Sequence, residues 1–114
     1  MAYTEPFDAI DEKTRDISRA ITSLREELEA VDWYNQRVNT SKDFELKGIM
    51  AHNRDEEIEH AVMTLEWLRR NMDGWDHELK TYLFTEGSVL DVEEGGAEDA
   101  LSQSSTLSIG DLKQ

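Results

Sequence analysis

Apolar residues recur at steps of four and three residues in the first part of the chain, which is the spacing of a helix that packs against another helix. The positions are Ile17, Ile21, Leu24, Leu28 and Val31. They predict a helix that begins between Pro6 and Asp11 and ends near Val38. Pro6 is the only proline in the 114 residues, so no proline interrupts the helix once it has begun.

The following stretch, Phe44–Asn71, is predicted to form a second helix. Residues 39–43 (NTSKD) break the apolar pattern and supply side chains that cap helices. Gly74 is a plausible stop signal, after which a short third helix is expected over Trp75–Phe84. The predicted fold class is therefore all-α. It consists of an antiparallel two-helix hairpin plus a short C-terminal helix, in a domain that covers residues 1–85.

A hairpin of this size cannot bury its own apolar faces. The second helix carries a further apolar line, on a different side from its main stripe, formed by Ile58, Val62 and Leu65. Two apolar faces on one helix require partners on two sides. We therefore expect a homo-oligomer with more than one kind of interface, in which pairs of hairpins form four-helix units.

The C-terminal quarter differs in composition from the helical part. Residues 86–104 contain glycines, serines and six acidic residues, with no lysine or arginine, and predict a flexible linker. Residues 105–114 become apolar again, with Leu107, Ile109 and Leu112 around Gly110. This pattern indicates a short peptide that docks in a groove of a partner. The alternative is an ordinary frayed terminus.

The net charge of -14 argues against a nucleic-acid partner, because phosphate backbones need a basic surface. The acidic groups either attract hard cations or only solvate a helical surface. The chain has no cysteine, which excludes disulfides, iron–sulfur clusters and thiolate zinc sites and fits a reducing cytoplasm. The first residues lack an apolar run, so we expect neither a signal peptide nor a membrane span.

A Glu-x-x-His motif, Glu57 and His60, lies in the apolar stripe of the second helix, where both side chains can reach the same ion. The motif alone is a weak signal, but an ionised group on a packing face is costly unless it is paired or bound to metal. Glu27 lies on the packing side of the first helix. Di-iron bundles use two Glu-x-x-His pairs and two single glutamates. One chain thus carries half of such a ligand set, and a two-fold dimer would complete it.

Two polar residues, Tyr34 and Asn53, lie near the candidate ligands. Tyr34, beside Glu27, either hydrogen-bonds a ligand or positions oxygen, or else it packs in an interface. Asn53 lies one turn before Glu57 and is a candidate to orient that carboxylate.

A second group on the first helix points away from Glu27. Its members are Glu26, Glu29 and Trp33. They are either an exposed helix face or a second metal-attracting cluster at an oligomer interface, and the helix geometry alone favours the exposed face.

Carboxylates combined with an imidazole suit iron(II), manganese and zinc. The leading interpretation of these ligands is a di-iron centre shared between two chains. One alternative is a non-catalytic helical assembly module, in which Glu57 and His60 are only a polar pair in an interface. Another is a zinc or manganese protein with the same ligands and different chemistry.

Two runs of the sequence resemble the encapsulated ferritins. They are EELEAVDWYNQRV, residues 26–38, and AHNRDEEIEHAVMTLEWLRRN, residues 51–71, and TYLFTEG, residues 81–87, continues the match. The resemblance covers most of residues 10–85. The tail STLSIGDLK, residues 105–113, resembles the peptides that address cargo to encapsulin shells.

The resemblance implies an open ring of ten chains, in which the ferroxidase centre is completed between two chains. It implies oxidation of iron(II) with oxygen, and mineral storage inside a surrounding cytoplasmic encapsulin shell. By motif position, the implied di-iron ligands are Glu27, Glu57 and His60, with Tyr34 adjacent. The implied metal-attracting site, which iron would meet first, consists of Glu26, Glu29 and Trp33.

Overall fold

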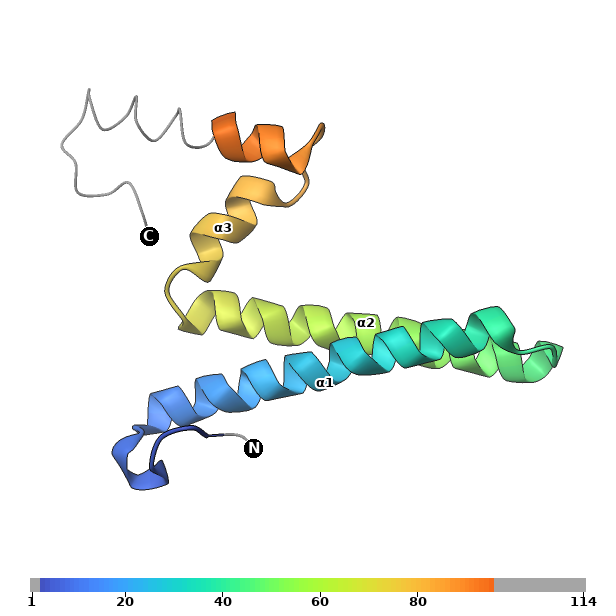
Figure 1. Cartoon of the computed structure of the whole chain (residues 1–114), viewed down its shortest axis with the longest axis horizontal. Coiled ribbons are helices and arrows are strands. Elements are labelled where there is room, and N and C mark those ends of the chain that lie inside the picture. The colour runs from blue at the N-terminus through green and yellow to red at the C-terminus, as the bar shows by residue number, and fades with distance from the viewer. Residues whose placement is uncertain (1–2, 96–114) are drawn as a thin grey trace. The chain divides into compact units, whose positions relative to one another are not determined.

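The computed structural model describes residues 3–95, whose regular secondary structure is helical, with no strand. The elements in order are a short 3-10 helix η1 (Phe7–Ala9) and the helices α1 (Glu12–Thr40), α2 (Phe44–Asn71) and α3 (Trp75–Tyr82) (Figure 1). The predicted all-α fold with a long helical hairpin and a short third helix is confirmed. The chain divides into two compact units, with the boundary after Leu68.

Local capping explains where the two long helices begin. The Asp11 carboxylate accepts a hydrogen bond from the Thr14 amide at 2.8 Å, and the Asp43 carboxylate accepts one from the Leu46 amide at 2.8 Å. Each aspartate satisfies a backbone N–H that has no partner within its own helix. Backbone hydrogen bonding to Asp11 likewise lowers the pKa of its carboxyl.

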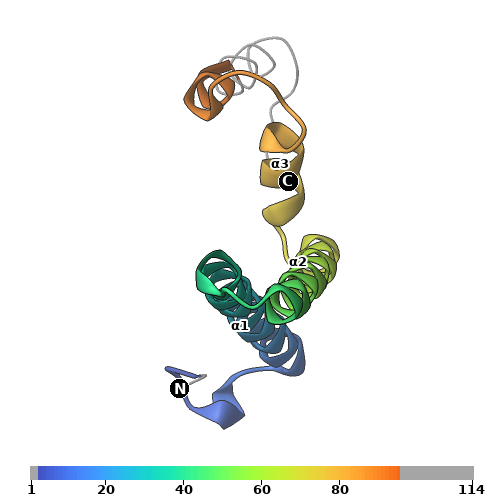
Figure 2. The same cartoon turned by 90° about the vertical axis from the view of Figure 1, so that its right-hand side faces the viewer.

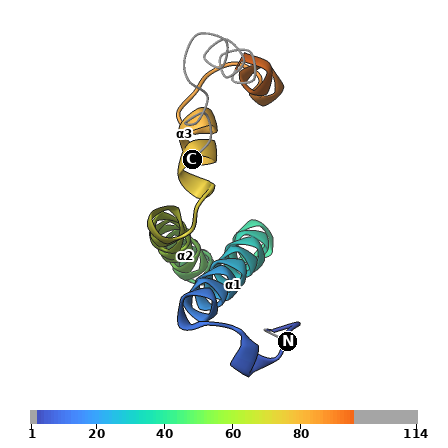
Figure 3. The same cartoon turned by 90° about the vertical axis from the view of Figure 1, so that its left-hand side faces the viewer.

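In the first unit, α1 and α2 run antiparallel and lie side by side, as the end-on views in Figure 2 and Figure 3 show. Two side-chain contacts define their register. The Arg54 guanidinium donates to the Asn35 side-chain oxygen at 3.1 Å, and the Thr64 hydroxyl donates to the Glu27 carboxylate at 3.0 Å. The partner on α1 moves back along the chain as the residue on α2 moves forward, which is the register of an antiparallel hairpin.

The hairpin shields few of its apolar side chains. Among the described residues, the buried apolar ones are Ala61 and Leu68, while Leu28 on α1 is 55% exposed and Val62 on α2 is 59% exposed. The predicted second apolar line is open at Ile58 and Val62. A single copy therefore leaves much of its apolar surface in water, and the homo-oligomer stays a prediction that this exposure supports.

The second unit begins with the last turn of α2 and continues into α3. Gly74 precedes α3 with a φ of 101°, a backbone conformation that glycine adopts without steric cost. Asp76, in the first turn of α3, forms ion pairs with Arg69 and, at 3.1 Å, with Lys80. These two partners lower the pKa of the Asp76 carboxyl.

The predicted linker over residues 86–104 differs from the structure in one part. Residues 89–95 are helical. The Ser88 hydroxyl accepts from the Leu90 amide at 3.2 Å, and the Ser88 carbonyl accepts from the Val92 amide at 3.0 Å. Ser88 thus caps a helix start that the acidic, glycine-containing composition concealed. The rest of that linker and the tail of residues 105–114 lie outside the described residues.

Candidate metal centre

Glu57 and His60 lie on one side of α2 and contact each other. The imidazole Nδ1 is 2.8 Å from Oε1 of the Glu57 carboxylate. This hydrogen bond raises the pKa of the His60 imidazole above its usual value, and the negative charges of Glu57, Glu56 and Glu27 act in the same direction. In the single chain the Glu57 side chain is 25% exposed and that of His60 is 47% exposed. The pair is therefore at the rim of the hairpin, where a second molecule could cover it.

Glu27 is partly buried on α1 and is joined to α2 through Thr64. The Thr64 hydroxyl oxygen lies 3.0 Å from Oε1 of Glu27 and 3.1 Å from the backbone carbonyl oxygen of His60. The turn that carries His60 and the side chain of Glu27 thus meet at one hydroxyl group. The sequence pattern places Thr64 on the same stripe as Glu57 and His60, but a search for ligand types passes over it because a neutral hydroxyl rarely binds iron.

The described residues of a single chain do not form a complete metal site. Within residues 3–95, no three acidic or histidine side chains come close enough to hold an ion together. The structure brings Glu57 to His60 and ties Glu27 to the turn of His60, which is a partial ligand set. A centre of the di-iron class on this surface would need ligands in addition to these three residues.

The two neighbouring residues with open roles lie on the same two helices. Tyr34 is partly buried on α1, with the Arg37 guanidinium 5.5 Å from the centre of its ring. Asn53 is partly buried on α2, one turn before Glu57. Their predicted roles beside a metal stay predictions.

The second group on α1, which consists of Glu26, Glu29 and Trp33, is exposed to solvent. Glu26 and Glu29 are exposed, and Trp33 is 49% exposed. Trp33 lines a shallow hollow near the end of α1 together with Gln36, Arg37 and Thr40. Glu27, between these acids in sequence, is the one that turns toward α2. The predicted separation of the two groups on α1 therefore agrees with their exposure.

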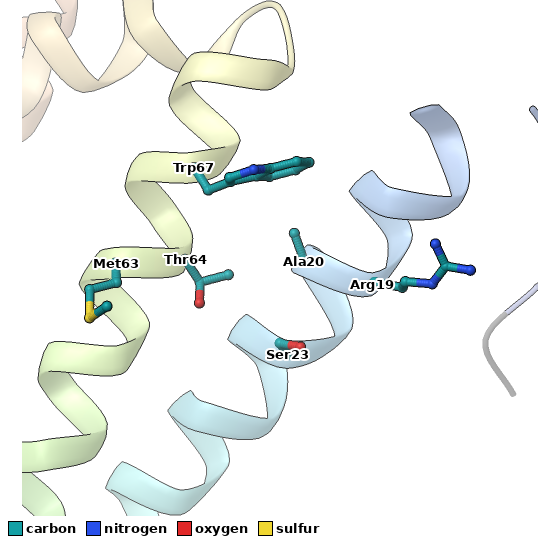
Figure 4. Close-up of a pocket in the computed structure, with 6 residues that line it drawn as sticks. All are labelled: Arg19, Ala20, Ser23, Met63, Thr64 and Trp67. Atoms are coloured by element: carbon teal, nitrogen blue, oxygen red, sulfur yellow. The ribbon is translucent and has the colours of Figure 1, made fainter. Parts of the chain in front are cut away.

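A second hollow opens between α1 and α2 beside Thr64. Its lining residues are Arg19, Ala20, Ser23, Met63, Thr64 and Trp67. Figure 4 shows Thr64 pointing from α2 toward α1, with the Trp67 ring extending across the same gap. Small side chains on α1, Ala20 and Ser23, leave this space open.

The fold and the site define an all-helical, ferritin-like class of protein, whose hairpin carries carboxylates and a histidine on two adjacent helices. The EncFtn-like family model matches residues 2–86. The chain therefore belongs to the EncFtn-like family, and its resemblance to encapsulated ferritins is confirmed.

Individual relatives agree with this assignment. The encapsulated ferritin-like protein of Rhodospirillum rubrum is 52% identical over 120 residues, which cover 96% of this chain and 86% of that protein. The ferritin-like protein of Thermotoga maritima is 56% identical over 100 residues, covering 85% and 88%. A crystal structure of a protein from Nitrosomonas europaea is 62% identical and matches with a TM-score of 0.75, covering 77% of this chain and 98% of that one. In the described part of this chain, no helix is long and apolar enough to cross a membrane.

Proposed function

We propose that this protein is a ferroxidase, which oxidises iron(II) to iron(III) with oxygen at a di-iron centre shared between two chains. Each chain would supply Glu27, Glu57 and His60, so that two copies provide four carboxylates and two imidazoles. The observation that carries the proposal is the meeting of the Glu27 carboxylate and the His60 turn at the Thr64 hydroxyl, at 3.0 and 3.1 Å. Membership of a ferritin-like family supports it.

The chain's own residues would act on iron(II), the substrate, in two ways. Carboxylate oxygens stabilise the increase in charge from iron(II) to iron(III), and the imidazole completes a ligand set that suits iron. Glu57 and its symmetry mate would bridge the two ions, while Glu27 and His60 would cap each of them. The same ligand symmetry also allows the reverse assignment, with Glu27 bridging and Glu57 capping. Tyr34 would hydrogen-bond a ligand or position oxygen.

The exposed second group on α1, which consists of Glu26, Glu29 and Trp33, has a proposed role in delivering iron to the centre. Glu26 and Glu29 are carboxylates in solvent on α1, and Trp33 lies one turn beyond Glu29. Such a cluster attracts cations at the surface of a chain whose net charge is -14. We propose that iron meets this site first and then moves to the shared centre.

The test of the proposed function is native mass spectrometry with iron(II) added in the absence of oxygen. We expect two irons per pair of chains in the wild type and their loss in Glu57→Ala. Glu59→Ala is the matched control, since Glu59 is an exposed glutamate on the same helix outside the proposed ligand set. Iron bound singly to monomers, or not at all, would overturn the shared centre and favour the non-catalytic assembly module. Zinc or manganese in the protein after expression in iron-rich medium would favour different chemistry.

The proposed assembly is a ring of ten chains inside an encapsulin shell in the cytoplasm, where the oxidised iron is stored as mineral. A relative of similar sequence is described as an encapsulated ferritin-like protein. The proposed contact to the shell is the C-terminal peptide, through Leu107, Ile109, Gly110 and Leu112, which lie outside the described residues. No part of the ferroxidase centre is proposed to lie in that peptide.

Deletion of Leu107 to Lys113 is expected to leave iron oxidation unchanged and to abolish loading into an encapsulin shell. The reason is that the apolar side chains of the peptide would fill a groove of the shell, while the catalytic ligands lie on α1 and α2. Co-purification with co-expressed shells measures loading. A variant with the same seven residues in scrambled order controls for length and composition, and loading that survives the deletion would contradict the docking role.

A further inference from the structure

We infer that Thr64 is a positioning residue, which holds the Glu27 carboxylate in the orientation that the metal centre requires. This inference rests on the proposed function. It concerns a neutral side chain that supplies no ligand. Its evidence is the pair of contacts made by one hydroxyl group, to a carboxylate on α1 and to a carbonyl on α2.

The hydroxyl has a single proton and two nearby acceptors. An ionised Glu27 has no proton to donate, so at 3.0 Å the Thr64 hydroxyl is the donor and Oε1 of Glu27 is the acceptor. The His60 carbonyl, at 3.1 Å, competes for the same proton. The carboxylate is the stronger acceptor, because hydrogen bonds to an ionised group are about twice as strong as neutral ones. The proton is therefore directed to Glu27.

The contact with Thr64 occupies one oxygen of the Glu27 carboxylate and leaves the other to bind metal. Oε1 of Glu27 accepts from Thr64, while Oε2 remains as the donor atom for an ion. The hydrogen bond also restricts the long Glu27 side chain, which otherwise samples many rotamers. A carboxylate held in advance loses less conformational entropy when it binds an ion.

The Thr64 hydroxyl contacts both Glu27 and the backbone of His60, two proposed ligands that are far apart in sequence. Glu27 and Thr64 are separated by 37 residues, whereas Thr64 lies one turn after His60 on α2. Any sliding of α1 along α2 would stretch the contact to Glu27 while leaving the contact to the His60 carbonyl intact. Thr64 thus sets the position of the Glu27 carboxylate relative to the helical turn that presents His60.

Thr81 provides the comparison with a threonine whose hydroxyl contacts only the backbone. Thr81 is partly buried and makes the same type of helical contact, from its hydroxyl to the His77 carbonyl at 2.8 Å. Within residues 3–95, this hydroxyl donates to no carboxylate. Thr81→Val therefore removes a backbone contact alone. Thr64→Val removes the same kind of contact together with the donor to Glu27, and valine keeps the shape of threonine and its branched Cβ.

The experiment is a titration of the full-length assembly with cobalt(II), followed by visible absorption of the bound ion and by native mass spectrometry. Compared with the wild type, we expect the dissociation constant to rise about tenfold to a hundredfold in Thr64→Val. Thr64→Ser keeps the hydroxyl and should restore the wild-type constant and spectrum, and Thr81→Val should match the wild type. Thr64→Ala compared with Thr64→Ser repeats the test with small side chains, in case valine perturbs packing. Circular dichroism checks that each variant is folded.

The outcomes separate this inference from the proposed function. Wild-type affinity and spectrum in Thr64→Val, with cobalt(II) still bound at two ions per pair of chains, would overturn the role of Thr64 and leave the shared centre intact. An equal loss in Thr64→Ser would overturn it as well, because the hydroxyl would then not be the cause. A wild-type protein that binds no cobalt(II) at this stoichiometry would overturn the proposed centre, and the role of Thr64 with it.

Discussion

Replacement of His60 by alanine is expected to slow the oxidation of iron(II) by more than about a hundredfold, since even groups that only support metal ligands alter activity about tenfold to a hundredfold. The substitution removes the nitrogen donor from each half of the proposed centre. It also removes the hydrogen bond, 2.8 Å long, that holds the Glu57 carboxylate beside it. One change therefore removes one proposed ligand and loosens another. The initial rate of iron(III) formation in air, measured by absorbance, is the readout.

The control for this variant is His52→Ala. His52 lies two helical turns earlier on α2, its side chain is 72% exposed, and its Nε2 is 4.0 Å from an oxygen of Glu56. It therefore reports what the loss of a surface imidazole does to the protein outside the centre. Because the His60 side chain is 47% exposed, we expect the helical content of His60→Ala to match the wild type. A wild-type oxidation rate in His60→Ala would remove His60 from the centre.

The second prediction concerns pH. The hydrogen bond to Glu57 raises the pKa of His60, with further contributions from the charges of Glu57, Glu56 and Glu27. A metal ion binds the neutral imidazole, so the ion must displace the proton that these carboxylates favour. Metal affinity should consequently fall as the pH is lowered through the pKa of His60, by about tenfold per pH unit for each proton displaced.

Folding stability and metal affinity depend on the protonation of His60 in opposite directions. A raised pKa means that the folded, metal-free chain is stabilised by a protonated His60 at pH values below the unfolded pKa of about 6.5. That contribution is lost as the pH rises through the folded-state pKa. Metal binding changes in the opposite direction: it strengthens with pH and levels off above the raised pKa of His60.

Two measurements test the pH prediction. A proton NMR titration of the His60 ring without metal should give a midpoint above the usual value, and cobalt(II) affinity should follow the deprotonated fraction. Glu56→Gln is the matched variant, because it removes one of the charges that raise the pKa and leaves Glu27, Glu57 and His60 in place. Its midpoint should move to lower pH. An affinity for cobalt(II) that does not vary across the His60 titration would contradict the prediction.

The candidate site was predicted from the sequence only in part. The contact between Glu57 and His60 follows from their spacing, because residues three apart on a helix lie on adjacent turns. The direction of Glu27 toward the second helix followed from its place in the apolar stripe. Thr64 was not predicted as a site residue, since its contact to Glu27 depends on the register of two helices. The roles of Tyr34 and of the group Glu26, Glu29 and Trp33 remain proposals.

The sequence by itself determined approximately where α1, α2 and α3 lie. The first helix begins at Glu12 and ends at Thr40, slightly later than predicted at both ends, and α3 ends at Tyr82 and not near Phe84. The predicted second helix agrees with α2, Phe44–Asn71, at both ends, and the third helix begins at Trp75 as expected. These boundaries are local, because caps such as Asp43 and the hydrogen bonds within a helix involve residues only a few positions apart. The helix over residues 89–95 was not predicted, because the glycines, serines and acidic residues of this stretch favoured a linker. In the structure, Ser88 caps the start of that helix.

Only the tertiary structure decided which side chains meet across the hairpin. The pairs Arg54 with Asn35 and Thr64 with Glu27 fix how far α2 is shifted along α1 and how each helix is rotated about its axis. Repeating apolar stripes allow several registers of similar energy, because each shift by one turn places apolar residues against apolar residues again. Specific polar contacts between distant residues distinguish these registers, and such contacts leave no periodic signal in the sequence.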